Sequence, residues 1–440
     1  MYSKVLMPMV IVLVLSTCTV RAAIIDSTWI GPWSSPWGNP DNWSPPVIPN
    51  NTADDTFVVT IGSAGEFAQV GLLRDFTIGQ LHCYGTVDIE KRTRGWKENV
   101  PTIGLTLSET EGLTNHGSLE LDGEDGMRII GNVTNAPGAD MEIWGVLDIE
   151  EGTLHNSPGA HIYMGGDDIA VEGGGLDNRG SITIDPETEF MSDRTLHNAG
   201  RIYIRGGQCQ TDNVLDNSST GVVEGFGYLY AEQLLRNNGR ITASGGTLSI
   251  LIDGSMTNAG IMTNNAGTVL HVQSSAADLD NEGIISVNAG GAVTFNGGLN
   301  NKPSGTIQLK GGTFAATELV QTAGATFEGF GSITGNVAIE SDGIIKLTGH
   351  TNIVGNVAIE HNAVLEISDG QVLITGHTTC NGTIHMKGGR IVPQGGLSGD
   401  CNVVSEPSIY GNIADLGHRE PDFRAVAFLA DNWLRQTNWH

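Results

Sequence analysis

Proline, cysteine and basic side chains are all scarce in this chain of 440 residues. With 15 Pro and 5 Cys, the chain is neither collagen-like nor a disulfide-dense scaffold. Lys and Arg together number 22 against 49 Asp and Glu, which gives a formal net charge of −27. Nucleic acids and anionic membranes are recognised by clustered cations, so this charge balance excludes both as partners.

Long apolar runs are also lacking. After the first 22 residues no hydrophobic stretch approaches the ~20 residues that span a bilayer, so we expect no transmembrane segment in the mature chain. Glycine is abundant instead, with 61 residues, and hydrophobic side chains make up 39% of the chain. This combination indicates short strands around a packed core, joined by many tight turns.

Residues 1–22 have the pattern of a secretory signal peptide. Lys4 precedes an apolar run from Val5 to Leu15, and a small-x-small cleavage site ends at Ala22. The alternative is a lipoprotein signal ending at Cys18, although Thr is a poor residue in front of such a cysteine. Either way we expect a secreted protein, located outside the cell or at its surface.

The strongest signal is an internal repeat of the phrase apolar-x-Asn. Ten copies follow one another, with their asparagines 19 to 23 residues apart. The asparagines of the ten copies are Asn115, Asn135, Asn156, Asn178, Asn198, Asn217, Asn237, Asn258, Asn281 and Asn301. The phrase then fades, but Val320-Gln321-Thr322 arrives at the same step.

A period of about 20 residues, made of strand-like segments and Gly turns, predicts an all-β fold. The expected architecture is a parallel, right-handed β-helix solenoid over residues 62–405, although the repeat itself is compatible with either hand. Some 16–17 coils of ~4.8 Å rise would make a rod about 80 Å long. No helical periodicity interrupts this region, which argues against leucine-rich repeats.

Alternation along a strand places the first and third residues of each phrase on one face. We therefore expect the apolar residue and the Asn to point inward, where the amides form a hydrogen-bonded ladder from coil to coil. The middle residues point outward and stack as His155, Asp177, His197, Asp216 and Arg236. Their alternating charge favours pairing between neighbouring coils.

Residues 23–61 differ from the repeats and are predicted to form an N-terminal cap. They contain Trp29, Trp33, Trp37 and Trp43, followed by Asp54-Asp55 and the apolar segment 56–61. The tryptophans either plug the first coil, as an end coil requires, or stack on glycan rings. The pattern resembles the start of autotransporter-like and PEP-CTERM-like secreted β-helix surface proteins of planctomycete-type bacteria.

Residues 406–440 contain the one clear amphipathic helical pattern, over 423–434. This segment resembles a degenerate dockerin-like tail, whose calcium loop would begin at Asp415. Gly417, Arg419 and Glu420 replace the oxygen donors and the glycine that such a loop uses. We therefore expect no cofactor, with weak Ca²⁺ binding at Asp415 as the alternative, and a helix that caps the rod or docks to a partner.

Candidate catalytic residues are few. Asp167 and Asp168 lie in Gly-Asp-Asp-Ile-Ala-Val, which resembles a fragment of polygalacturonases that holds paired acid and base carboxylates. The companion motifs of those enzymes are missing, and a solvated turn explains the pair equally well. His155 and His197 are two coils apart, about 10 Å, which is too far for one metal ion.

Four cysteines remain after the expected cleavage, and two of them are 21 residues apart, one repeat. Cys380 and Cys401 would therefore stack on neighbouring coils at a distance that a disulfide spans. The alternative is that coil length drifts near the C-terminus and both remain thiols. Cys83 and Cys209 are about six repeats apart and cannot pair with each other.

These observations predict an exported, non-catalytic β-helix protein that serves as a cell-surface, matrix or adhesion component. An extracellular polysaccharide or another surface protein is the expected partner. The alternative is a polysaccharide-acting enzyme, a glycoside hydrolase or lyase, with its site on one face of the β-helix.

Overall fold

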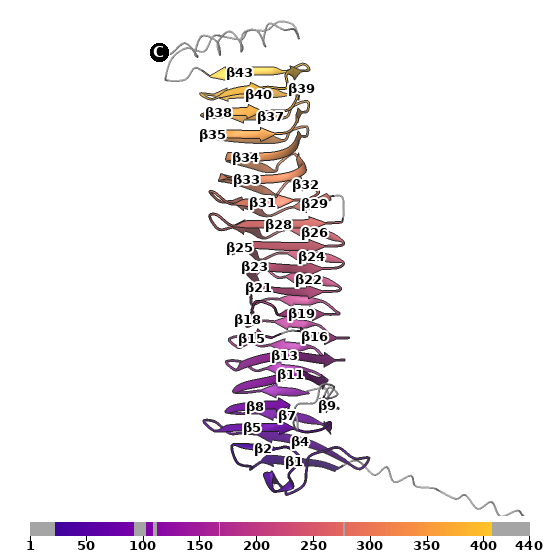
Figure 1. The fold of residues 1–440 in the computed structure, drawn as a ribbon. Coiled ribbons are helices and arrows are strands. Elements are labelled where there is room, and N and C mark those ends of the chain that lie inside the picture. The colour runs from indigo at the N-terminus through magenta and orange to yellow at the C-terminus, as the bar shows by residue number, and fades with distance from the viewer. Residues whose placement is uncertain (1–22, 92–102, 109–111, 167, 276–277, 407–440) are drawn as a thin grey trace, which may run out of the picture.

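The chain folds as a β-solenoid of about 15 turns whose strands are mostly parallel, as the repeat predicted. The computed structural model describes residues 23–91, 103–108, 112–166, 168–275 and 278–406. The coils stack along one axis from the N-terminal to the C-terminal end (Figure 1). The expected signal peptide, almost all of the dockerin-like segment, Asp415 and Asp167 lie outside the described residues.

Each coil contributes to three columns of strands, which we call sheets 1, 2 and 3 in the order in which a coil visits them. Sheet 1 carries the apolar-x-Asn phrases, paired in register from coil to coil. Its strands are β1 (Ala23–Trp29), β4 (Asp55–Ile61), β7 (Gln80–Cys83), β10 (Leu113–Asn115), β12 (Val133–Asn135), β14 (Leu154–Asn156), β17 (Leu176–Asn178), β20 (Leu196–Asn198), β22 (Val214–Asn217), β24 (Leu234–Asn237), β26 (Ser255–Asn258), β29 (Asp278–Asn281), β32 (Gly298–Asn301), the last parts of β33 (Thr306–Gln321) and β34 (Thr326–Ile339), β36 (Val357–Ile359), β39 (Thr378–Cys380) and β42 (Leu397–Ser398).

Sheet 2 follows the turn after each Asn. It consists of β2 (Ser34–Pro36), β5 (Phe67–Leu72), β8 (Thr86–Lys91), the first parts of β11 (Ser118–Ile130) and β13 (Asp140–Glu150), β15 (His161–Gly165), β18 (Ser181–Ile184), the first parts of β21 (Arg201–Thr211), β23 (Val222–Ala231) and β25 (Arg240–Ile252), β27 (Ile261–Asn264), β30 (Ile284–Val287), the first parts of β33, β34 and β35 (Ile344–Val354), β37 (Val364–Ile367), β40 (Thr383–Lys387) and β43 (Asn402–Glu406).

Sheet 3 completes the coil. It consists of β6 (Phe76–Ile78), β9 (Ile103–Leu107), the last parts of β11 and β13, β16 (Asp168–Glu172), β19 (Glu189–Ser192), the last parts of β21, β23 and β25, β28 (Val269–Ser274), β31 (Ala292–Phe295), the middle of β33 and β34, the last part of β35, β38 (Gln371–Ile374) and β41 (Arg390–Pro393). Long strands such as β21 and β23 run from sheet 2 into sheet 3 through a register shift at the corner.

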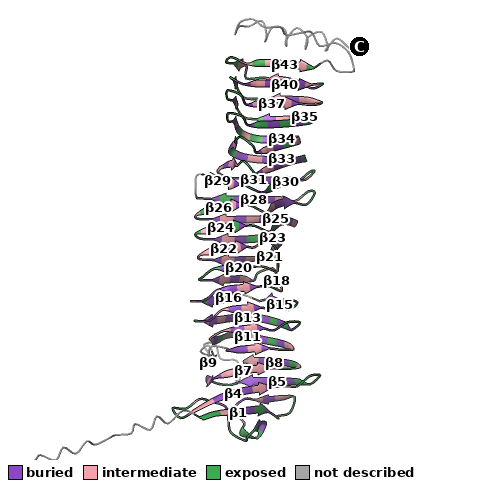
Figure 2. Ribbon diagram, turned by 180° about the vertical axis from the view of Figure 1, so that it is seen from behind, coloured by how far each residue is buried: buried purple, intermediate pink, exposed green. Residues whose placement is uncertain are grey.

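The core is a single apolar column enclosed by the three sheets, because alternate residues of every strand point inward. β21, for example, reads exposed, buried, half-buried, buried at its start, and the phrase strands read buried, half-buried, buried. Buried and exposed positions therefore alternate along the ribbons over the length of the rod (Figure 2). Phe190, Phe314 and Phe327 are among the largest fully buried side chains.

Coil length is less uniform than the repeat suggests. Leu81 pairs with Leu113, so the coil between them takes 32 residues (113 minus 81). At the N-terminal end the parallel stack begins inside the expected cap, because β1 already pairs with β4 and β4 pairs with β7.

Candidate functional site

The phrase asparagines form one continuous ladder along sheet 1. Each is at most 1% exposed, and each Nδ2 donates to the Oδ1 of the next coil at 2.7–3.2 Å, from Asn115 up to Asn301. Asn301 continues the ladder into Gln321 at 2.8 Å. All donors point in the same direction along the axis, so neighbouring amides polarise one another.

The second N–H of each of these amides donates to a backbone carbonyl. Asn115 donates to the Asp140 carbonyl at 2.7 Å, and Asn178 donates to the Arg201 carbonyl at 3.1 Å. Each asparagine thus satisfies a carbonyl near the corner between sheets 1 and 2 while it bonds to the next coil. The role is structural: these residues hold coil to coil and present no atoms to a ligand.

The middle residues of the phrases stack on the outer face of sheet 1. His155 Nδ1 lies 3.7 Å from the Asp177 carboxylate, and His197 Nδ1 lies 3.2 Å from that of Asp216. Asp216 also pairs in register with Arg236. Asp177 stands between the two histidines, so they do not share one site.

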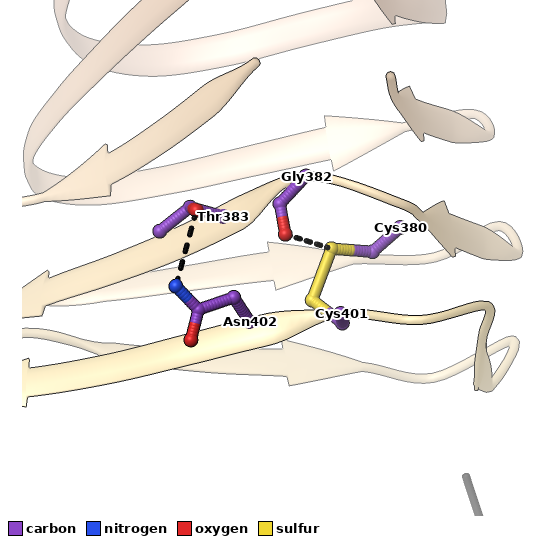
Figure 3. The surroundings of a disulfide bond; sticks show 5 residues. All are labelled: Cys380, Gly382, Thr383, Cys401 and Asn402. Atoms are coloured by element: carbon purple, nitrogen blue, oxygen red, sulfur yellow. Dashed lines mark hydrogen bonds between the residues drawn. A yellow bond between two sulfur atoms is a disulfide. The ribbon is translucent and has the colours of Figure 1, made fainter. Parts of the chain in front are cut away.

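A disulfide joins Cys380 and Cys401 across neighbouring coils, with their Cα atoms 4.9 Å apart (Figure 3). It ties β39 to the residue in front of β43, next to the Asn402 side chain, which donates to Thr383 at 3.4 Å. The remaining described cysteines, Cys83 and Cys209, are buried thiols. Burial raises the pKa of both to about 12, so neither is a reactive nucleophile.

Three of the four N-terminal tryptophans are buried at the end of the core. Trp43 packs edge-on against Trp29 and Trp37 at 4.9 and 4.8 Å between ring centroids. The indole N–H of Trp37 donates to the Pro49 carbonyl and that of Trp43 to the Trp37 carbonyl. Buried rings cannot stack on sugars, so the glycan-stacking interpretation is wrong for these three; only Trp33, 69% exposed, retains a free face.

Asp168, the described member of the candidate catalytic pair, begins β16 and is exposed. Asp148 lies on the preceding coil and pairs in register with Ala170, two residues after Asp168. Burial raises the pKa of the Asp148 carboxyl, and the nearby charges of Glu150 and Asp168 raise it further. Asp148 and Asp168 therefore lie on neighbouring coils of sheet 3, offset by two residues in the register, whereas Asp167 lies outside the described residues.

A column of carboxylates runs along the corner at the end of sheet 3. Backbone hydrogen bonds place these residues one above another on successive coils, at about 4.8 Å per coil. The carboxylate column consists of Glu150, Glu172, Asp193, Asp212, Glu232 and Asp253. The sequence shows these residues only as scattered acids, because the steps between them vary from 19 to 22 residues.

A second acidic group occupies the outer face of sheet 2 near the N-terminal end. Asp88, Glu120 and Glu142 stack in register on β8, β11 and β13. Burial, followed by the charges of Asp88 and Glu142, raises the pKa of Glu120. In the described part of the chain no three or more His, Cys, Asp or Glu side chains are arranged to hold a metal ion.

Beyond this acidic group, aromatic side chains follow on the same face. Tyr163 stands next to Glu142, Tyr203 lies two coils further on, and Glu224 follows Tyr203. In the adjacent outward column, Trp144 pairs with Gly165, and Arg205 pairs with Phe226. We call Trp144, Tyr163, Tyr203, Arg205 and Phe226 the aromatic strip. No repeated motif in the sequence marks these five residues as neighbours.

Hydrogen bonds and ring contacts hold the aromatic strip. The Tyr163 ring packs on Trp144 with centroids 5.1 Å apart, and its hydroxyl donates to Asp185. This hydrogen bond, with burial and the Asp185 charge, raises the pKa of Tyr163 to about 12, so the hydroxyl stays protonated. The Arg205 guanidinium lies over the Tyr203 ring at 5.2 Å and 3.7 Å from Asp185.

In the described residues, no helix is long and apolar enough to cross a membrane. Comparisons with models of known protein families, with curated proteins and with solved structures found no match to this chain.

Proposed function

We propose that this chain is an exported, non-catalytic β-helix protein that acts as a cell-surface, matrix or adhesion component. The observation that carries the proposal is the axial stack, in which an unbroken amide ladder from Asn115 to Gln321 bonds each coil to the next. A rod bonded in this way is stiff and long, and it displays regular columns of side chains on its outer faces. Such a rod suits a spacer or an adhesive surface.

The disulfide supports export, because such bonds persist in oxidising compartments. It lies on the last coil, where one neighbour is missing and fraying is easiest. The signal-peptide pattern of residues 1–22 agrees with export. We also propose that the chain is related to the autotransporter-like surface proteins that its N-terminal segment resembles.

The proposal is tested by locating the protein in the cell that produces it. Intact cells would be treated with a protease or a membrane-impermeant biotin reagent, and a variant lacking residues 1–22 would serve as the control. We expect labelling of the full chain and loss of labelling in the variant. A full chain found in the cytoplasm with Cys380 and Cys401 reduced would contradict the proposal.

A polysaccharide-acting enzyme is the second candidate, favoured by the raised pKa of Asp148 beside Asp168. A carboxyl group whose pKa is raised by its surroundings is typical of the general acid of a glycosidase. Release of reducing ends or of unsaturated products from a panel of polysaccharides, abolished in Asp148→Asn and Asp168→Asn, would replace the first proposal with this one.

A further inference from the structure

The aromatic strip has features that a structural role alone does not require. It spans five consecutive coils, β13 to β23, about 19 Å along the axis at ~4.8 Å per coil, and has members on four of them, while the β18 coil carries Thr183 in that row. Trp144 and Phe226 are each 37% exposed although both are large and apolar. Partly exposed aromatic rings in a row offer a surface on which sugar rings stack through their C–H groups.

The local packing keeps these rings upright. Position 165 is glycine, and a Cβ there would lie 2.7 Å from Trp144 Cζ3 and 2.8 Å from Tyr163 Cε1. Tyr203 and Tyr163 flank Thr183 on the coil between them, and Thr183 is only 8% exposed. The rings are therefore held in fixed positions, which lowers the entropy cost of binding a ligand.

Polar groups border the rings on the same coils. Glu142 accepts a hydrogen bond from the Trp144 indole N–H at 3.4 Å, and Asp185 accepts one from Tyr163. Glu224 pairs with Arg201, and Arg205 pairs with Asp185. Carboxylates and guanidinium groups beside aromatic rings offer acceptors and donors to sugar hydroxyls.

Charge selects among glycans. Arg205 of the strip and its neighbour Arg201 are already paired with carboxylates, and the chain carries a net charge of −27. An anionic polysaccharide would be repelled by this field. A polycation would be attracted to the carboxylates but would make little use of the rings. The rings fit an uncharged glycan, because Asp185 and Glu224 beside them are paired with arginines and Glu142 is left to accept hydrogen bonds.

We infer that the aromatic strip is a binding site for an uncharged polysaccharide, whose strand lies along the rod axis with sugar rings stacked on Trp144, Tyr163, Tyr203 and Phe226. This inference rests on the proposed function and gives the surface component its ligand class. The coil spacing supports it, because the rings stand on two pairs of neighbouring coils, β13 with β15 and β21 with β23, and the step of ~4.8 Å within each pair is comparable to one sugar unit of an extended strand.

The test uses the purified full chain without residues 1–22. Depletion from solution would be measured with insoluble cellulose, β-1,3-glucan, xylan, mannan and chitin, and affinity electrophoresis would be run with soluble forms. We expect binding to at least one of these polymers, weakened about two- to tenfold by Trp144→Ala and by Tyr203→Ala, since one stacked ring contributes a factor in that range.

Two further variants make the test specific. Phe330→Ala removes an aromatic side chain, 45% exposed, on coils away from the strip, and should leave binding unchanged. Gly165→Ala removes no ring but pushes Trp144 and Tyr163 apart, and should weaken binding. Thermal unfolding midpoints of all variants, measured in parallel, show that each one is folded.

The inference is overturned if the folded protein binds none of the five polymers. It is also overturned if Trp144→Ala and Tyr203→Ala bind as well as Phe330→Ala. Chitosan, run beside the five polymers as a polycation, gives the last criterion: binding confined to chitosan and lost in salt also overturns the inference. Each of these results leaves the surface location untouched, whereas a cytoplasmic location would contradict the proposed function without altering binding by the purified protein.

Discussion

Replacing Asn301 by leucine removes one member of the amide ladder at a place where the sequence supplies its own control. Asn301 accepts from Asn281 at 2.7 Å and donates to Gln321 Oε1 at 2.8 Å and to the Thr326 carbonyl at 3.0 Å. Leucine leaves two fully buried groups unpaired, one N–H of Asn281 and the Gln321 oxygen. At ~1–3 kcal/mol for each unpaired group, we expect a loss of about 2–6 kcal/mol.

The adjacent residue, Asn300, provides the matched control. It points outward, is half-buried and makes one hydrogen bond, to Asp280 at 3.2 Å. Asn300→Leu changes the same atoms in the same strand but leaves no fully buried group unpaired, so its cost should stay below about 1 kcal/mol.

Urea unfolding followed by circular dichroism would compare the two variants. Native-state hydrogen exchange would localise the effect, because a solenoid need not unfold in a single step. Protection should fall first in the coils on either side of residue 301. If the two variants are equally stable, the ladder adds no stability and our account of it is wrong.

The double variant sharpens the prediction. Asn281→Leu alone leaves two groups unpaired, the Asn301 Oδ1 and one N–H of Asn258. The double variant Asn281→Leu with Asn301→Leu also leaves two groups unpaired, one N–H of Asn258 and the Gln321 Oε1. If the effects of the two single changes were additive, the double variant would have the cost of four unpaired groups. Because it has only two, we expect it to be about as stable as either single variant, which is a large departure from additivity.

Three other predictions follow from charge and from the disulfide. Cys401→Ser should lower the unfolding midpoint and speed hydrogen exchange in the last coils, because the bond to Cys380 closes a loop of 21 residues, worth about 3 kcal/mol in the chain-entropy model. The unsubstituted chain without residues 1–22, denatured but not reduced, should show two free thiols, and four would contradict the bond. Glu120→Gln should stabilise the fold at pH 7. The raised pKa of Glu120 means that the folded state is penalised once this carboxyl ionises, so the gain should vanish as the pH falls below about 4; a gain that persists in acid would contradict the electrostatic cause. Asp212→Asn, in the middle of the carboxylate column, should raise the midpoint at low ionic strength by relieving repulsion on both sides. The effect should shrink in 1 M salt, where the Debye length is about 3 Å, and insensitivity to salt would show that the column carries no repulsion.

The features that depend on inward-facing residues follow from the sequence alone. A phrase that returns every 19 to 23 residues fixes coil length, strand direction and the inward-facing asparagines. The separation of Cys380 and Cys401 by one repeat places them on neighbouring coils. These inferences tolerate small variations in coil length, because each amide must reach the next one and so restores the register of sheet 1 at every turn.

The outward features were decided by the tertiary structure. Coil length varies at the corners, where β21 and β23 each carry a register shift between sheets 2 and 3. A fixed step through the sequence therefore does not predict which exposed residues stack. Trp144, Tyr163 and Tyr203 lie on one face, and six acids form a column, because the turns differ in length and so bring these residues into register. The buried amides determine how the coils stack. The corners are solvated, so their length varies at little cost, and this length determines which exposed residues align on the surface.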